Sequence, residues 1–480
     1  MELLAILVIA AAASGISLFP AGRKLAPAVT VLGSFAILVL SAGAAFQTLS
    51  GRDVIAVRDW MSCDGFGALI LLLVAFVGFA AALFSWGYME KTVGPREQGR
   101  IQRYYSRFNL FLLSMLAVPI FSQVALVWIA VELTTLLSVF LVSFESTPEA
   151  LEAAWKYVVL TCMGAAIALL GILILYWGMS IVSREPFTWA GLVAAAPLMS
   201  PVILSTAFFF ILIGYGTKVG LVPLHTWLPD AHSQAPSPVC ALLSGVETTT
   251  VLYAIMRMIP MFQGAQAGYA SLWFILFGML SVGAAAFLLI QAKDYKRLFA
   301  FSTVEHMGII LVAAGLGGYG AFFGATLQMV SHAVTKSLCF FSAGATLLAT
   351  GSRDIASVRG LIRTSPSAGV FLMIGGLGIA GAPPFAVFLS EFAILKAGID
   401  KGHYILTAFL ALFIVVAFFG IMYQINRMVF GKPSISVRVS LPAACIATLA
   451  LMALPAVLLG FYIPEPLQTL LHLAASALGR

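Results

Sequence analysis

Residues 124–144 read VALVWIAVELTTLLSVFLVSF, and this stretch decides which class of protein the chain belongs to. Its only charged residue is Glu132, close to the middle. A helix needs about 20 apolar residues to cross the hydrocarbon core of a bilayer, and lipid offers open backbone groups no hydrogen-bond partner. The stretch therefore predicts a transmembrane helix that carries an ionisable side chain inside the membrane.

Apolar stretches of this kind recur along all 480 residues. Of these residues 61% are hydrophobic and 9% are charged, whereas about a quarter are charged in soluble domains. We therefore predict an all-α polytopic membrane protein, a single membrane domain over 1–480 with about 14 transmembrane helices. The first stretch lacks a basic region before it, so we expect a retained helix rather than a signal peptide. The predicted spans are residues 3–19, 26–49, 66–89, 108–121, 124–144, 151–179, 203–222, 238–258, 269–291, 299–315, 321–349, 368–397, 403–430 and 441–461.

The net charge of +7 is spread over short loops. It forms no basic stripe interleaved with aromatic residues, so we expect no nucleic-acid partner. Lys and Arg instead gather in alternate loops, and such loops face the cytoplasm of a bacterial-type inner membrane. This multi-pass chain would then have both termini outside. The basic loops contain residues 23–24, 91–107, 293–297, 353–363 and 427–438.

We expect no cofactor and no metal site in this chain. The five cysteines lie far apart and form neither a CxxC pair nor a Cys/His ligand spacing. Strings that fit GxGxxG occur at 315–320 and 376–381. A dinucleotide site needs a strand before the glycines and a helix after them. Both strings lie in or between predicted membrane helices, where small residues allow helices to pack closely.

Prolines inside one predicted span and directly after another should break the helix. Pro223 follows Lys218, and the pair Pro383 and Pro384 precedes Glu391. Proline removes a backbone donor and cannot continue a helix. In transporters, broken helices at corresponding places of two repeats mark the binding region.

The spacing of four charged residues also indicates an internal repeat. Lys218 follows Glu132 by 86 positions, and Glu391 follows Glu305 by 86 positions as well. An acid followed by a broken helix therefore occurs twice in the chain.

Ionisable residues inside a membrane are costly, so each needs an aqueous cavity, a partner or a role. Glu132 and Lys218 are the clearest candidates. Burial disfavours a charged group and an opposite charge favours it, so movement of either residue transfers proton affinity between them. We interpret the pair as a switch for proton transport. The alternatives are an interhelical hydrogen bond for Glu132 and, for Lys218, a side chain that extends to the membrane surface.

Gln328, His332 and Lys336 recur every four residues in the eleventh span and therefore share one helix face. Histidine titrates near neutrality and can pass protons in either direction. We predict a polar path along this face with Glu391 as its terminal group. Glu247, in the eighth span, would bridge the two halves. An ordinary interhelical contact remains the alternative for the row on the eleventh span.

Other charged residues are open to two interpretations. Glu305 and His306 lie near the expected cytoplasmic entrance of the tenth span, where they form either an uptake site or a solvated pair. Lys156 lies four residues after Glu152, a spacing typical of an ion pair on a helix surface, so its place in the proton path is secondary. Lys396 lies near the outer end of its span and is expected to extend to the membrane surface.

Five segments together carry a resemblance to one family. They are FSWGYM (84–89), KVGLVPLHTWLPDAHSQAPSPVCALLSG (218–245), KDYKRLFAFSTVEHMGII (293–310), SHAVTKSLCFF (331–341) and GAPPFAVFLSEF (381–392). They resemble the antiporter-like subunits of respiratory complex I, of membrane-bound NiFe hydrogenases and of multisubunit cation antiporters. The string PLHTWLPDAH is the most specific. The EHMG string of the tenth span is most similar to the F component of hydrogenase-4 complexes.

The resemblance implies a core of ten helices in two inverted five-helix repeats, each with one broken helix. The N-terminal three helices would occupy 1–106 and the first repeat 107–260. The second repeat would occupy 261–430, followed by a C-terminal helix and tail at 431–480.

The resemblance also implies which residues form the proton path. Where many members carry Lys or His on the eighth helix, this chain has Ser244, and Glu247 is expected to replace it. Lys156 matches a sixth-helix lysine found in some members. The other counterparts are Glu132 for the glutamate of the fifth helix, Lys218 for the lysine of the seventh, Lys336 for the lysine of the eleventh and Glu391 for the terminal group of the twelfth.

The resemblance and the buried charges imply a proton-translocating subunit of a redox-driven complex, either hydrogenase-4-like or NADH-quinone oxidoreductase-like, whose redox centres lie in other subunits. Expected partners are other membrane subunits, a peripheral redox arm, the lipid bilayer, and protons or Na⁺. Two other functions stay open, namely Na⁺/H⁺ antiport in a multisubunit cation antiporter and a non-conducting membrane scaffold. A scaffold would keep the proton gradient unchanged when Glu132 or Lys218 is neutralised.

Overall fold

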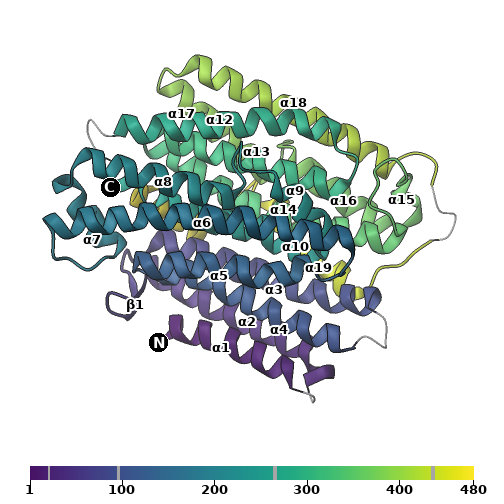
Figure 1. The fold of residues 1–480 in the computed structure, drawn as a ribbon. Helices are drawn as coiled ribbons and strands as arrows, with labels where there is room; N and C mark the ends of the chain where they lie inside the picture. Colours follow the sequence, from purple (N-terminus) through teal and green to yellow (C-terminus); the bar gives the residue numbers. More distant parts are fainter. Residues whose placement is uncertain (20–21, 94–97, 263–266, 434–437, 480) are drawn as a thin grey trace.

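The structure of this protein is a computed structural model, which describes residues 1–19, 22–93, 98–262, 267–433 and 438–479. Figure 1 shows long helices that run back and forth along one common direction, with the N-terminal helices (purple) at one side of the bundle. Within the described residues, ten helices are long and apolar enough to cross a membrane, and four shorter apolar helices accompany them. The predicted all-α polytopic membrane fold is confirmed, while the count of 14 spans stays a prediction.

The first part of the chain supplies eleven of the α-helices in the described residues. Their bounds are α1 (Glu2–Leu18), α2 (Gly22–Thr48), α3 (Gly65–Thr92), α4 (Gln98–Ile120), α5 (Val124–Val142), α6 (Pro148–Val182), α7 (Trp189–Ala195), α8 (Pro201–Val219), α9 (Trp227–Gln234), α10 (Ser237–Leu242) and α11 (Thr248–Met256). A π-helical turn (Leu243–Glu247) joins α10 to α11, so these three pieces form one continuous helix.

The second part continues the bundle and ends in a short amphipathic helix. The bounds are α12 (Ala267–Gln291), α13 (Tyr295–Leu316), α14 (Tyr319–Thr350), α15 (Leu361–Thr364), α16 (Pro366–Ile379), α17 (Ala386–Asp400), α18 (Tyr404–Val429), α19 (Ala443–Leu458) and α20 (Glu465–Leu478). Helices α12 and α18 lie side by side at the edge of the bundle opposite α1 (Figure 1).

Several short elements were not predicted from the sequence. They are a hairpin of β1 (Val54–Val57) and β2 (Met61–Cys63), together with α7, α9 and α20. Each is shorter than the roughly 20 apolar residues by which membrane spans are recognised. A search for spans therefore passes over them.

Both predicted helix breaks are present. Helix α8 ends at Val219, and Gly220 then adopts a left-handed conformation with φ of 86°. Helix α16 ends at Ile379, and Gly381 has φ of 73°. Glycine adopts positive φ without the steric cost of a Cβ atom, so each glycine turns the chain before the prolines. The single span expected at 368–397 is therefore two helices, α16 and α17.

Small residues let the helices pack closely, as expected for membrane helices. A Cβ atom at Gly171 on α6 would lie 2.7 Å from the Ala207 carbonyl oxygen on α8. In the second GxGxxG string, a Cβ atom at Gly378 would lie 2.8 Å from Thr335 Cγ2 on α14. Gly171 and Gly378 therefore allow close helix packing, whereas Gly317 and Gly381 of the two strings have positive φ and lie in turns.

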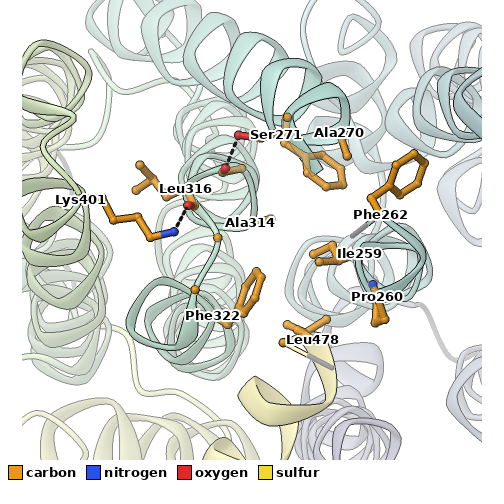
Figure 2. A pocket seen from close by; sticks show the side chains of 16 residues that line it. Ile259, Pro260, Phe262, Ala270, Ser271, Ala314, Leu316, Phe322, Lys401 and Leu478 are labelled. Carbon is orange, nitrogen blue, oxygen red and sulfur yellow. Dashed lines mark hydrogen bonds between the residues drawn. The ribbon is translucent and has the colours of Figure 1, made fainter. Parts of the chain in front are cut away.

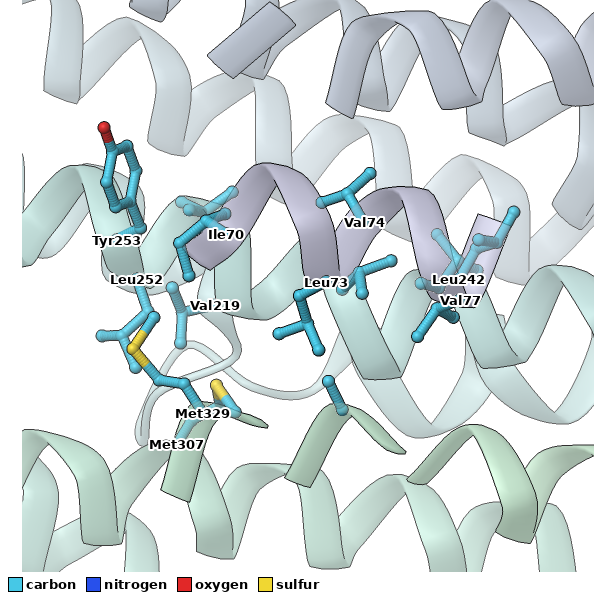
Figure 3. Close-up of a cluster of buried hydrophobic side chains, with 14 of the residues drawn as sticks. Ile70, Leu73, Val74, Val77, Val219, Leu242, Leu252, Tyr253, Met307 and Met329 are labelled. Carbon is cyan, nitrogen blue, oxygen red and sulfur yellow. The ribbon is translucent and has the colours of Figure 1, made fainter. Parts of the chain in front are cut away.

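Apolar side chains from several helices meet around the middle of the bundle. Figure 3 shows this cluster, in which α3 lies against α11 and against residues of α13 and α14. Its labelled members are Ile70, Leu73, Val74, Val77, Val219, Leu242, Leu252, Tyr253, Met307 and Met329, which are all buried. Charges next to such a cluster are poorly screened and therefore interact strongly with one another.

Candidate functional site

A buried ion pair joins the end of α8 to the π-helical turn. Lys218 Nζ lies 3.1 Å from Glu247 Oε1, and both side chains are 2% exposed. Hydroxyl groups complete the surroundings of the pair. Thr134 Oγ1 donates to Glu247 Oε1 at 2.7 Å, the Tyr157 hydroxyl donates to the same oxygen at 3.2 Å, and Lys218 donates to Thr135 Oγ1. The ionic and polar groups of α5, α6, α8 and the π turn thus converge on one place.

The local fold positions Lys218 at a helix end. After the turn at Gly220, Trp227 at the start of α9 folds back, and its Nε1 donates to the Thr217 carbonyl oxygen at 2.8 Å. The indole ring also packs on the Tyr157 ring, with centroids 4.7 Å apart. The Thr217 carbonyl group beside Lys218 therefore accepts from Trp227 as well as from the Gly220 amide at the end of α8.

The π turn positions Glu247. The Thr248 amide donates to the Leu243 carbonyl oxygen, five residues before it. Single π turns inside α-helices are frequent at functional sites, because the extra residue rotates the side chains that follow. Gly245 allows the turn to lie close to α14, since a Cβ atom there would approach the Ala333 carbonyl oxygen to 3.1 Å. No residue pattern in the sequence predicts this turn.

A second cluster lies on α13, α14 and α17. Lys336 Nζ is buried and donates to the Phe299 carbonyl oxygen at 3.0 Å and to Ser302 Oγ. The carboxylate of Glu305 is also buried, and its Oε2 has no hydrogen-bond partner among the described residues. The solvated alternative for Glu305 is therefore wrong, and the same holds for His306, which is 0% exposed.

His306 connects α13 to the second broken helix. Its Nε2 lies 3.0 Å from the Ile379 carbonyl oxygen, which can only accept, so Nε2 is the donor. Its Nδ1 then accepts from Gln328 Nε2 at 2.7 Å, and the same nitrogen lies 3.9 Å from Glu391 Oε1. Gln328 in turn accepts from Ser390 Oγ. The predicted polar face of α14 therefore reaches the predicted terminal carboxylate.

His332 connects the second cluster to the π turn. Its Nε2 donates to the Ser244 carbonyl oxygen at 3.1 Å, and its ring centroid lies 5.3 Å from that of His306. The Ser244 hydroxyl bonds to Thr303 Oγ1 at 2.6 Å. The π turn thus contacts the first cluster through Glu247 and the second cluster through Ser244.

Comparison with known proteins identifies the family. The family model described as "NADH:quinone oxidoreductase/Mrp antiporter, TM" matches residues 122–419, which is more than half of the chain. The chain belongs to this family of antiporter-like membrane subunits. A second model, "NADH-Ubiquinone oxidoreductase (complex I), chain 5 N-terminus", matches residues 61–105.

Individual relatives of this antiporter-like subunit agree with the assignment. A hydrogenase-4 component F homolog of Methylacidiphilum infernorum (isolate V4) is 37% identical over 381 residues, which are 77% of this chain and 79% of that protein. A chain of the membrane-bound sulfane sulfur reductase, an archaeal respiratory membrane complex, superposes with a TM-score of 0.89 at 27% identity, over 99% of this chain and 97% of that one. A chain of the Mrp complex from Dietzia sp. DQ12-45-1b superposes with a TM-score of 0.87 over 100% and 97% of the two chains, at 17% identity, which shows the shared fold alone.

Glu132 of this antiporter-like subunit lies apart from the ion pair. In the described residues, Lys218 forms its salt bridge with Glu247 and not with Glu132. Glu132 interacts instead with the Cys162 thiol, and its Oε2 is buried without a hydrogen-bond partner. The expected pairing of Glu132 with Lys218 therefore differs from the observed one, because the π turn brings Glu247 closer.

Lys156 and Lys396 lie at the surface of the antiporter-like subunit. Lys156 Nζ lies 2.6 Å from Glu152 Oε1 and 3.2 Å from Asp230 Oδ2, with 47% of its side chain exposed. The helix-surface ion pair expected from the spacing is thus present. Lys396 is 68% exposed and lies 3.7 Å from Asp400. Its extension to the membrane surface stays a prediction.

Some polar residues of the site escaped the sequence analysis. Thr134, Thr135 and Tyr157 surround the ion pair, and Asp230 holds Lys156. The two threonines follow Glu132 directly in the string ELTT, so a polar patch on that helix could have been noticed. Tyr157 and Asp230 carry no such signal, because their roles come from contacts between distant helices.

A pocket at the end of α13 lies away from these clusters. Figure 2 shows a half-open pocket of about 490 Å³ where α13 ends, lined by Ile259, Phe262 and Leu478 among others. Its polar side chains already have partners, since Lys401 and Ser271 donate to the carbonyl oxygens that end α13. Among the described residues, no group of three or more His, Cys, Asp or Glu side chains could hold a metal ion.

Proposed function

We propose that this antiporter-like subunit moves protons across the membrane within a redox-driven complex. The observation that carries the proposal is the buried ion pair of Lys218 and Glu247 at a broken helix. Ionisable residues inside a membrane are retained for transport or charge movement, since their burial is otherwise costly. Members of the family are multi-pass membrane proteins, and we place this chain in a membrane on that basis. The Lys and Arg residues in its alternate loops support our proposal that both termini lie outside.

The contacts suggest an order of events. A proton that reaches Glu247 neutralises it and removes the charge that holds Lys218. Lys218 can then release its proton or turn toward Glu132, on the neighbouring α5. The π turn contains both Glu247 and Ser244, so a change at Glu247 reaches His332 through the Ser244 carbonyl group. Protons would leave through Lys336 toward Glu391.

The relatives support a redox-driven complex as the source of energy. The hydrogenase-4 component F homolog and the chain of an archaeal respiratory complex are both similar along most of this chain. Because the described residues contain no cluster that could hold a metal ion, electron transfer is proposed to occur in other subunits. A change of charge where this chain contacts those subunits would change the protonation of Glu247 first and of Lys218 afterwards.

The function can be tested in inverted membrane vesicles that hold the intact complex. We expect a hydrogenase or NADH-type electron donor to acidify the vesicle interior in sodium-free buffer, as measured by quenching of a pH-sensitive dye. The second candidate is Na⁺/H⁺ antiport, favoured by the family model that includes Mrp antiporters. Antiport predicts that a sodium pulse without an electron donor discharges an imposed pH difference, and donor-driven acidification would then be absent.

The second helix break, between α16 and α17, indicates where a partner subunit contacts this chain. Helices α16 and α17 have 14 and 15 residues, so each spans about 20 Å and the break lies near the middle of the membrane. Pro383 and Pro384 are exposed there. Irregular backbone at membrane depth is tolerated only where protein or a water-filled cavity covers it. We therefore propose that a transmembrane helix of another subunit lies against the break.

A photo-crosslinking residue in place of Phe388 tests this contact. Phe388 lies in the first turn of α17 and is 38% exposed, next to the break. We expect it to form a crosslink to another subunit of the complex in native membranes. The matched control is Phe419 on α18, which is 66% exposed and reports the background of lipid adducts. If Phe388 formed lipid adducts alone, the proposed contact would be wrong.

A further inference from the structure

The short helix α9 lies between the two halves of the chain. It packs against α6 on one side and against α13 on the other. Its residue Asp230 binds a cation from each side, since Oδ2 lies 3.2 Å from Lys156 Nζ and Oδ1 accepts from Arg297 Nη2. Lys156 belongs to α6, whereas Arg297 lies in the first turn of α13. One carboxylate therefore joins the first predicted repeat to the second.

The C-terminal end of α9 is held by further cations of the second half. Lys296 Nζ is buried, lies 3.4 Å from the Ser233 carbonyl oxygen and also donates to that of Ala235. Arg353 donates to the Ser233 carbonyl oxygen as well. Cations are favourable at the C-terminal end of a helix, where carbonyl groups lack partners within the helix. Helix α9 is therefore attached to the second half at both its middle and its end.

The start of α9 reaches the buried ion pair. Trp227 donates to the Thr217 carbonyl oxygen, one residue before Lys218. The same ring packs on Tyr157, whose hydroxyl donates to Glu247 Oε1. A displacement of α9 would therefore move groups that contact both members of the pair.

We propose that Asp230 is a positioning residue that couples the two halves of the proton path. By binding Lys156 and Arg297 together, it fixes α9 against α13 and so transmits a shift of α13, which carries Glu305 and His306, to the Lys218–Glu247 pair. This inference rests on the proposed function. An exposed salt bridge alone contributes little to stability, so the role of Asp230 is in the coupling of its two partners rather than in holding the fold.

The first experiment compares Asp230→Asn with Asp230→Glu in vesicles of the intact complex. We expect Asp230→Asn to lower the number of protons moved per electron about fivefold, because the neutral amide no longer binds Lys156 and Arg297 as ion-pair partners. The amount of assembled complex should be unchanged. Asp230→Glu keeps the charge and should recover most of the ratio. Asp400→Asn, which breaks the exposed pair with Lys396, is the matched control and should pump normally.

The second experiment separates coupling from a purely structural role. Lys156→Met and Arg297→Gln are measured singly and together, first in a chain that keeps Asp230 and then in one that carries Asp230→Asn. Coupling predicts that the two effects on the proton-to-electron ratio are non-additive while Asp230 is present and become additive once Asp230→Asn has been introduced. Additive effects in both chains overturn the inference. Equal loss of assembled complex in Asp230→Asn and Asp230→Glu overturns it as well.

Failure of this inference differs from failure of the proposed function. If Lys218→Met pumps normally, the proton path is wrong whatever Asp230 does. If Lys218→Met abolishes pumping and Asp230→Asn pumps normally, the path stands and the coupling through Asp230 is wrong.

Discussion

Replacing Lys218 with methionine is expected to abolish electron-driven proton transport while the complex still assembles. Methionine fills a similar volume in apolar surroundings, so packing around α8 is kept. The variant removes the ammonium group that pairs with Glu247, and Glu247 can take up a proton and remain buried as a neutral acid. Proton movement and electron transfer should be measured in the same vesicles. Loss of proton movement while electron transfer continues would show that the two processes are no longer coupled.

The control for this prediction is Lys396→Met. Lys396 lies on α17, 68% exposed and close to Asp400. It has the same chemistry as Lys218 without its burial, so we expect pumping at the level of the unsubstituted complex. Normal pumping by Lys218→Met would favour a non-conducting scaffold. Loss of pumping by both variants would mean that the removal of any lysine disturbs the complex.

Much of the fold could be predicted because the bilayer restricts what a chain can do. Each predicted span corresponds to one or two helices, and the breaks at Gly220 and Gly381 lie beside the prolines that indicated them. The polar face of Gln328, His332 and Lys336 could also be predicted, since helical periodicity alone places these residues together. These are local properties, which a sequence expresses directly.

The partners of the buried charges could not be predicted, because they depend on contacts between distant helices. Lys218 was expected to pair with Glu132, yet Glu247 lies closer as a result of the π turn. Likewise, nothing in the sequence shows that Asp230 bridges two helices. The hairpin and α20 were missed for another reason, since short amphipathic elements lack the long apolar run that marks a span.

The replacement of the usual eighth-helix Lys or His by Ser244 gains an explanation from the geometry. The Ser244 carbonyl group holds His332, while its hydroxyl bonds to Thr303. Glu247, three residues on, pairs with the first half instead. Contact with each of the two clusters is thus divided between two residues of a single π turn.

Glu247→Gln is expected to reduce proton transport as severely as Lys218→Met, by about tenfold or more. Glutamine keeps the hydrogen bonds from Thr134 and Tyr157 but removes the charge opposite Lys218. Breaking one partner of a buried ion pair costs about 3–5 kcal/mol, because the other charge remains buried and unpaired. Within the described part of the chain, Lys218 would then have no carboxylate in salt-bridge contact that could take up and release a proton, which stops the cycle. Donor-driven acidification of vesicles, normalised to the amount of complex, measures the effect.

Two further variants test the prediction for Glu247→Gln. Glu132→Gln should have the smaller effect, since Glu132 forms no salt bridge with Lys218 among the described residues. The double variant Lys218→Met with Glu247→Gln should assemble better than Glu247→Gln alone, because no unpaired charge is left, yet it should not pump. A severe loss in Glu132→Gln combined with normal transport in Glu247→Gln would show that the observed pairing is not the one on which transport depends.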